Sequence, residues 1–242
     1  MPRYPSSTYG ASFSFGPGPL STLLKALVAA NVAVFLAQQL VPALTTTLGL
    51  VPAAVVENFR FWQLGTYMFL HGGVFHLLFN MLALWMFGTE LERIWGTRYF
   101  LKFYFVTGIG AAALTVLVSL VFSHALYGSV VIGASGAIYG LLLAYALYFP
   151  DRPIYLYLVF PIPAKYFVMI IGGLAFYSSM GQTSGVANAT HLGGLVVGYL
   201  YLKGGRLQPL GEIKYRYLKW KMNRTRRRFD VYSGGKSDRH IH

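Results

Sequence analysis

Residues 69–88, FLHGGVFHLLFNMLALWMFG, form an almost continuous apolar stretch without Asp, Glu, Lys or Arg. A helix of about 20 apolar residues is long enough to cross the hydrocarbon core of a bilayer. Polar side chains are costly at that depth, yet this stretch holds His71, His76 and Asn80. The segment therefore predicts a membrane helix that carries functional side chains.

The composition of the whole chain also indicates a membrane protein. Of its 242 residues, 55% are hydrophobic and 11% are charged, whereas a soluble domain has about 25% charged residues. The chain has no cysteine, which excludes disulfides, thiolate metal sites and a cysteine nucleophile. We predict an all-α polytopic membrane protein whose bundle of six helices spans residues 20–42, 69–88, 99–122, 135–149, 165–181 and 189–203.

The two ends of the chain differ from this membrane domain, which we place at residues 20–203. Residues 1–19 are rich in Pro, Gly, Ser and aromatics, and predict a flexible arm without the pattern of a signal peptide. Residues 204–242 form a basic tail: from Lys203 onward, twelve Lys or Arg against three acids give +9 of the net charge of +13. A topology signal that contacts anionic lipid is the favoured interpretation of the tail, ahead of nucleic-acid binding or a solvated end.

The distribution of cations predicts the orientation of the helices. An even number of helices puts both termini on one side, and the basic tail makes that side cytoplasmic. The connections that then face the cytoplasm hold Arg93, Arg98, Arg152 and Lys165, whereas the outside loops hold only Arg60. The first outside loop, residues 43–68, is mostly apolar and is expected to lie in the membrane interface, with Trp62 as an ordinary anchor.

This topology brings separated polar residues to one face of the membrane. The second, fourth and sixth helices all begin outside, so Ser135, His191, and His71 with His76 are expected at a similar depth. Ser135 stands in VIGASGAIYG at a helix start, where backbone N–H groups lack helical partners and can stabilise an oxyanion. GASG alone is weak, because small residues also serve helix packing.

Glycines every four residues predict that the fourth and sixth helices pack closely. Gly136 and Gly140 recur on the fourth helix, and Gly194 and Gly198 on the sixth, which is typical of faces that let backbones approach. His191 lies on the same face as Gly194, so this contact would bring it to the roughly 3 Å that a nucleophile and its base require.

The second helix offers candidates for the oxyanion site. His76 and Asn80 are one turn apart and can both present donors to one developing charge. His71 is rotated away from His76 on an ideal helix and more plausibly ties this helix to the first loop. Each histidine alone is also compatible with a structural hydrogen-bonding role.

Elimination predicts a Ser–His dyad without a third acid. The chain has seven acids, and only Glu57 falls on the outside face. The imidazole must then be oriented by another group. Tyr139, one turn below Ser135, can stack on the ring, or it can be a plain packing aromatic.

Taken together, HGGVFHLLFN, GASGAIYG and HLGG resemble the rhomboid intramembrane proteases over roughly residues 20–203. The resemblance implies that Ser135 is the nucleophile and His191 the base. It also implies that His76, Asn80 and the Ser135 backbone N–H form the oxyanion site, with Tyr139 packed on His191. We further expect His71, Gly133 and Gly136 to support the site.

The resemblance also implies a substrate and a setting. The substrates would be single-span or multi-span membrane proteins, cut within a transmembrane helix near its outer end. No cofactor, metal or nucleic acid is expected, and the setting would be a prokaryotic inner membrane. FGTELERIWG resembles the family's segment after the second helix, which makes Glu92 and Arg93 structural. Two departures are Gln63, where the family often has Arg after Trp, and Thr190, where Ala is common before the histidine.

Two other functions compete with proteolysis. A non-cleaving relative would bind transmembrane helices, but the presence of both Ser135 and His191 argues against it. A metal enzyme or transporter using His71, His76 and His191 has the imidazoles that zinc prefers. It lacks the H-E-x-x-H helix of membrane zinc peptidases.

Overall fold

The computed structural model describes residues 17–122, 124–156, 160–179 and 185–204. Contacts divide the chain into two units, residues 1–202 and residues 203–242. Most of the predicted basic tail and of the N-terminal arm therefore lies outside the described residues. Every candidate site residue belongs to the first unit.

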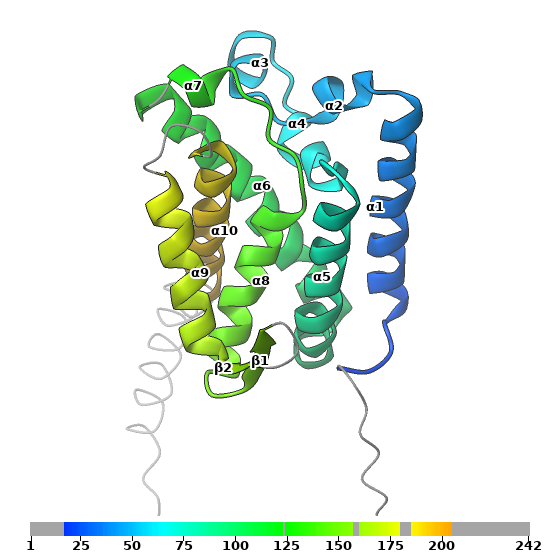
Figure 1. Cartoon of the computed structure of the whole chain (residues 1–242), viewed down its shortest axis with the longest axis vertical. Coiled ribbons are helices and arrows are strands. Elements are labelled where there is room, and N and C mark those ends of the chain that lie inside the picture. Colours follow the sequence, from blue (N-terminus) through cyan, green and yellow to red (C-terminus); the bar gives the residue numbers. More distant parts are fainter. Residues whose placement is uncertain (1–16, 123, 157–159, 180–184, 205–242) are drawn as a thin grey trace, which may run out of the picture. The chain divides into compact units, whose positions relative to one another are not determined.

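Long helices make up the first unit, and each of the six predicted helices has a counterpart among them. Figure 1 shows them side by side. Among the described residues, three of these helices, α1, α5 and most of α6, are long and apolar enough to cross a membrane, while α8 and α9 are shorter apolar helices. The all-α class is confirmed. The bounds are α1 Thr22–Leu40, α5 Val74–Trp95, α6 Thr97–Phe122, α8 Ser135–Tyr148, α9 Ala164–Ser179 and α10 Gly185–Gly204.

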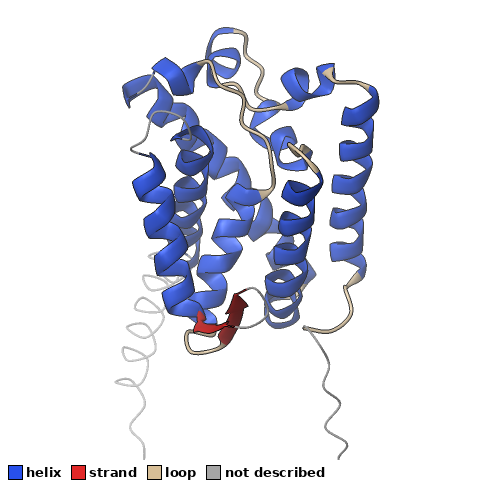
Figure 2. Ribbon diagram, viewed as in Figure 1, coloured by secondary structure: helices blue, strands red, loops and turns tan. Residues whose placement is uncertain are grey.

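Short elements occupy the connections at the two ends of the bundle. We call the end with α2, α3, α4 and α7 the loop end, and the opposite end, with the antiparallel strands β1 and β2, the hairpin end (Figures 1 and 2). The hairpin pairs Ile154 with Ile162; the sequence analysis did not predict it. The bounds are α2 Ala43–Leu48, α3 Pro52–Glu57, α4 Gln63–Thr66, η1 Tyr67–Phe69, α7 His124–Tyr127, β1 Pro153–Leu156 and β2 Phe160–Pro163.

The predicted bounds of the second helix were wrong at both ends. α5 begins at Val74, because Gly72 and Gly73 interrupt the apolar stretch, and Gly73 has an extended φ of 164°. It then continues through the charged segment to Trp95 and ends at Gly96, whose φ of 75° favours glycine. The predicted connection 89–98 is therefore helical apart from Gly96. Glu, Leu and Arg are good helix formers, so the helix does not stop where its hydropathy falls.

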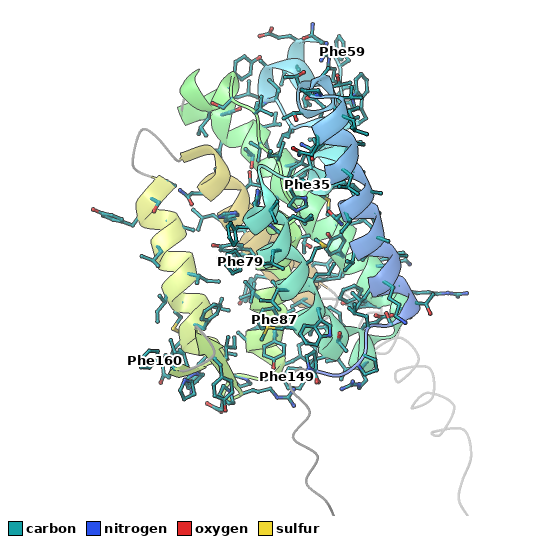
Figure 3. The ribbon with its side chains drawn as sticks, turned by 45° about the vertical axis from the view of Figure 1, so that its right-hand side comes forward. Phe35, Phe59, Phe79, Phe87, Phe149 and Phe160 are labelled. Atoms are coloured by element: carbon teal, nitrogen blue, oxygen red, sulfur yellow. The ribbon has the colours of Figure 1, made fainter. Side chains whose placement is uncertain are left out.

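The charged residues of that segment join elements at the hairpin end. Glu92 is buried and accepts hydrogen bonds from the hydroxyls of Ser21 (2.5 Å) and Thr97 (2.8 Å). Arg93 pairs with Glu90 and also donates to the carbonyl of Pro17. Both residues thus have the structural contacts that the sequence suggested. Figure 3 shows Phe149 at this end and Phe59 at the loop end.

α8 lies at the centre of the bundle, in contact with α5, α6 and α9. A helix that is apolar all round is typically buried on every side. Nine of its fourteen residues are buried: Gly136, Ala137, Ile138, Gly140, Leu141, Leu142, Ala144, Tyr145 and Ala146. The N-terminus of this enclosed helix carries Ser135.

Candidate active site

The predicted close contact between α8 and α10 is present. A Cβ added to Gly194 would lie 2.0 Å from the carbonyl oxygen of Gly136, and one added to Gly198 would lie 3.1 Å from the Cα of Gly140. Gly136 is itself enclosed, because a Cβ there would meet the Tyr67 hydroxyl at 2.8 Å. The two helices touch through their backbones at these glycines, as the four-residue spacing predicted.

This contact places Ser135 next to His191. The Ser135 Oγ lies 2.8 Å from the His191 Nε2. The Tyr139 ring stacks on the imidazole, with centroids 4.3 Å apart and planes inclined by 4°. His191 lies within α10 and not at its start, because that helix begins at Gly185, four residues earlier than predicted. Three candidate side chains therefore form one cluster.

No acid in the described part of the chain binds the other ring nitrogen of His191. Its Nδ1 is buried without a hydrogen-bond partner in the residues that the structure describes. The four described acids are engaged elsewhere: Glu57 with Tyr127, Glu90 with Arg93 and Arg152, Glu92 with Ser21 and Thr97, and Asp151 with Lys165. The geometry is that of a serine–histidine pair whose ring is oriented by stacking.

The loop before Ser135 depends on Gly133. Its φ of +122° is in the region that favours glycine, and an added Cβ would lie 2.8 Å from the Nε2 and Cε1 of His76. The Gly133 N–H donates to the carbonyl of Tyr67 at 2.9 Å. Gly133 thus lets the loop pass directly beside His76 on its way to Ser135.

His76 and Asn80 lie on the first turns of α5. The Gly72 N–H donates to His76 Nδ1 at 3.2 Å, so a neutral ring carries its proton on Nε2, the atom beside Gly133. Asn80 is buried and donates one amide N–H to the carbonyl of His76 at 2.7 Å. In the residues that the structure describes, the Nε2 of His76 and the second amide N–H of Asn80 have no hydrogen-bond partner.

His71 lies in the loop before α5 and not on the helix. Its ring meets that of His76 edge to face, with centroids 5.1 Å apart. The expectation that the two rings diverge was wrong, because the turn at Gly72 and Gly73 replaces helical geometry. The predicted tie to the first loop runs through the backbone of His71 and the side chain of Gln38, whereas the Nδ1 and Nε2 of the His71 ring have no hydrogen-bond partner in the described residues.

Gln38 on α1 makes that link, and its side chain was not among the contacts predicted from the sequence. Its Oε1 accepts from the His71 N–H at 2.9 Å, and its Nε2 donates to Thr45 Oγ1 at 3.1 Å. A buried amide in an apolar helix is costly unless it is paired. The presence of Gln38 in an apolar helix was therefore the signal in the sequence that this side chain has a hydrogen-bond partner.

Thr190, the second departure from the family pattern, is 1% exposed at the contact between α6 and α10. Its hydroxyl lies 2.8 Å from that of Thr115, which in turn donates to the carbonyl of Ala111. The polar atom is thereby satisfied inside the bundle, and Thr190 packs beside Gly136.

The histidines do not form a metal-binding cluster in the described residues. Across this part of the chain, no three His, Asp or Glu side chains gather as metal ligands would. The His191 Nε2 faces Ser135, while the ring of His71 packs on that of His76.

Comparisons with known proteins point to one family. The Rhomboid domain model matches residues 58–205. The chain is 36% identical to Rhomboid protease GluP of Bacillus subtilis over 68% of its own length and 30% of that protein. It is 34% identical to the mitochondrial Rhomboid protein 1 of Saccharomyces cerevisiae over 55% of the chain and 38% of the relative. Rhomboid protease AarA of Providencia stuartii is 33% identical over 57% and 54%. The chain thus spans less than two thirds of these relatives.

Proposed function

The chain belongs to the rhomboid family, and from this premise we propose that it is an intramembrane serine protease in which Ser135 attacks the scissile carbonyl with His191 as base. The observation that carries the proposal is the 2.8 Å distance between Ser135 Oγ and His191 Nε2. A serine hydroxyl is a weak nucleophile until an adjacent base takes its proton.

The two residues act in sequence. Ser135 Oγ bonds to the carbonyl carbon while its proton passes to His191 Nε2. His191 then gives that proton to the leaving nitrogen as the C–N bond breaks. A water molecule then attacks the ester carbon and gives a proton to His191, which passes it to Ser135 Oγ as the ester C–O bond breaks. Tyr139 holds the imidazole plane by stacking, where other serine proteases use a carboxylate.

Three donors stabilise the negative charge that develops on the carbonyl oxygen. They are the backbone N–H of Ser135 at the start of α8, the Nε2–H of His76 and the free amide N–H of Asn80. The approach of Gly133 to His76 Nε2 supports this assignment, since it brings that atom next to the loop that ends at Ser135.

Membrane-protein helices are the proposed substrates. The site lies where α8 begins, toward the loop end, so a substrate helix is cut near the membrane face on that side. We assign that face to the outside and both termini to the cytoplasm of a prokaryotic cell, because basic residues concentrate in the hairpin-end connections and the tail. The tail, residues 204–242, is proposed to contact anionic lipid and not nucleic acid.

Covalent labelling tests the proposed dyad. The protein in lipid is treated with a fluorophosphonate, the adduct is located by peptide mass spectrometry, and cleavage of a single-span substrate is followed in parallel. We expect the adduct on Ser135, and we expect Ser135→Ala and His191→Ala each to abolish labelling and cleavage. Ser119→Ala is the matched control, because Ser119 bonds to the carbonyl of Val116 in α6 and should leave both signals unchanged.

The outcomes separate the competing functions. Cleavage that persists in Ser135→Ala, or an adduct on another serine, would contradict the proposal. A wild-type protein that binds single-span helices but shows neither adduct nor cleavage would be the non-cleaving relative. Loss of cleavage with a chelator and recovery with zinc would favour the histidine-based metal enzyme.

A further inference from the structure

Gln63 at the start of α4 is buried completely, although it is a polar residue in the first connection. Its Nε2 donates to the carbonyls of Thr46 (3.3 Å) and Thr47 (3.2 Å), and its Oε1 accepts from the N–H of Val51 (3.0 Å). A single side chain therefore binds both sides of the turn that follows α2.

Two of the three partners of Gln63, the carbonyls of Thr46 and Thr47, belong to the last turn of α2. The last carbonyls of a helix have no helical N–H partner. Besides Gln63, Trp62 donates its Nε1–H to the carbonyl of Thr47 at 3.0 Å. The hydroxyl of Thr66 donates to the backbone carbonyl of Leu48 at 2.6 Å. Side chains at α4 thus cap the C-terminus of α2. Among them, Gln63 also binds the N–H of Val51, which lies beyond the turn that follows α2.

The segment fixed in this way pairs with the loop that precedes Ser135. Leu50, one residue before the Gln63-bound Val51, exchanges two backbone hydrogen bonds with Val131, at 2.9 and 2.8 Å. Two residues after Val131, the Gly133 N–H is bound to Tyr67, which directly follows α4. The loop before Ser135 is therefore attached at two points, and Gln63 joins the segments that provide them.

We propose that Gln63 is a positioning residue for Ser135. By holding the turn after α2 against α4, it keeps Leu50 paired with Val131, and so keeps Ser135 Oγ in line with His191. The inference rests on the proposed function, since it assigns Gln63 an effect on the reactivity of that serine. Without the amide, the carbonyl of Thr46 and the N–H of Val51 lose their partner, the carbonyl of Thr47 keeps only Trp62, and the segment carrying Leu50 relaxes.

The first test replaces the amide with an apolar side chain of similar length. Gln63→Met removes the donor and the acceptor but keeps an unbranched side chain in the buried space. We expect the rate of fluorophosphonate labelling at Ser135 and the kcat for a single-span substrate to fall about 10- to 100-fold, because misplacing a reacting group by about 1 Å costs up to about 10²-fold. KM should change less than twofold, because Gln63 does not touch the substrate.

Two controls separate positioning from general damage. Gln39→Met changes an exposed glutamine of α1, which bonds within its own helix, and should leave labelling unchanged. Leu24→Ala creates a cavity beside Gly88, remote from Ser135, and should lower the thermal midpoint without slowing labelling of the folded protein. All rates are measured well below the unfolding transitions.

A covalent tether provides the decisive arm. Because the chain lacks cysteine, Leu50→Cys with Val131→Cys gives a single pair. Hydrogen-bonded antiparallel partners have Cα atoms about 5.5 Å apart, within disulfide range. In the Gln63→Met protein, oxidation of the cysteine pair should restore the rate of Ser135 labelling to within about threefold of the rate in the oxidised double-cysteine protein that retains Gln63. The reduced cysteine pair should not restore it.

Each result decides the inference. Rescue by oxidation, together with the drop in Gln63→Met, supports it. Wild-type labelling rates in Gln63→Met would overturn it, and so would a drop that the disulfide does not reverse. Absence of any Ser135 adduct in the wild-type protein would instead overturn the proposed function, which makes the two failures distinguishable.

Discussion

The two sides of the candidate site are held in different ways. Ser135 and His191 lie on α8 and α10, whose backbones touch at glycines, and Tyr139 stacks on the histidine. His76 and Asn80 lie on the first turns of α5, where their contacts are local hydrogen bonds to Gly72 and to the helix itself. Phe75, which precedes His76 on α5, is 73% exposed, so this part of α5 is less enclosed than the contact between α8 and α10.

This difference separates two requirements of the reaction. A nucleophile and its base must already be aligned when the substrate arrives, and close-packed backbones provide such alignment because they cannot shift independently. Oxyanion donors act only once charge develops, so they can retain local partners and still offer one free N–H each. Substitutions at the packed side should therefore be more damaging than those on α5.

The largest effect is expected at the packed side, from Gly194→Ala. The added methyl carbon would lie 2.0 Å from the backbone oxygen of Gly136 and would force α8 and α10 apart. We expect a loss of stability of about 3 kcal/mol, at the upper range of overpacking, and loss of Ser135 labelling. Thermal unfolding in lipid and adduct formation measure the two effects.

Gly173→Ala is the matched control for this prediction. Gly173 lies in α9, and an added Cβ would meet nothing within 4 Å. In a helix, Ala is favoured over Gly by about 1 kcal/mol, so this variant should be as stable as the wild type or more stable. Equal behaviour of the two variants would show that the α8–α10 contact does not align the site.

A smaller effect is expected from the α5 side, where Asn80→Ala removes one of the proposed oxyanion donors. We expect kcat to fall about 10²- to 10³-fold while the protein stays folded, as for oxyanion donors elsewhere. Turnover of a single-span substrate, with the thermal midpoint recorded beside it, is the measurement.

Asn31→Ala provides an unusually close control for Asn80→Ala. Asn31 on α1 is also buried and also donates its Nδ2 to the carbonyl four residues earlier, at 2.8 Å compared with 2.7 Å for Asn80. Both substitutions remove the same local hydrogen bond, but only Asn80 lies one turn from His76. Equal losses of kcat in the two variants would mean that Asn80 acts through the helix and not on the substrate.

The sequence predicted the packed side of the site better than the α5 side. Glycines at four-residue spacing report directly on backbone contact, so the meeting of α8 and α10 followed from Gly136, Gly140, Gly194 and Gly198. One helical turn also placed Tyr139 on the face of Ser135, where stacking on the imidazole was one of its two possible roles and is the one observed. In both cases the residues lie in a regular helix, so their spacing in the sequence fixes which of them share a face.

Prediction failed where the chain leaves regular helix. The turn at Gly72 and Gly73 moved His71 off α5 and against His76, and helical periodicity cannot predict that contact. In the sequence, Gln63 stands out only as a departure from a family pattern. Its hydrogen bonds reach residues 12 to 17 positions away across an irregular loop, and their partners depend on tertiary folding.

The smallest effect is expected at the exposed surface of the loop end, where Tyr127 of α7 donates to Glu57 of α3 at 2.9 Å. This hydrogen bond raises the pKa of Tyr127 above its ordinary value. A raised pKa contributes stability that is present below about pH 10 and is lost as the pH rises through the folded-state value. Because solvent competes for an exposed bond, Tyr127→Phe should change kcat less than twofold and lower the thermal midpoint only slightly.

The small difference in thermal midpoint between the wild type and Tyr127→Phe should disappear at strongly alkaline pH, as measured by unfolding scans from pH 7 upward. A large loss of kcat in Tyr127→Phe would show that the surface contact between α3 and α7, and not the buried pairing of Leu50 with Val131, fixes the loop before Ser135.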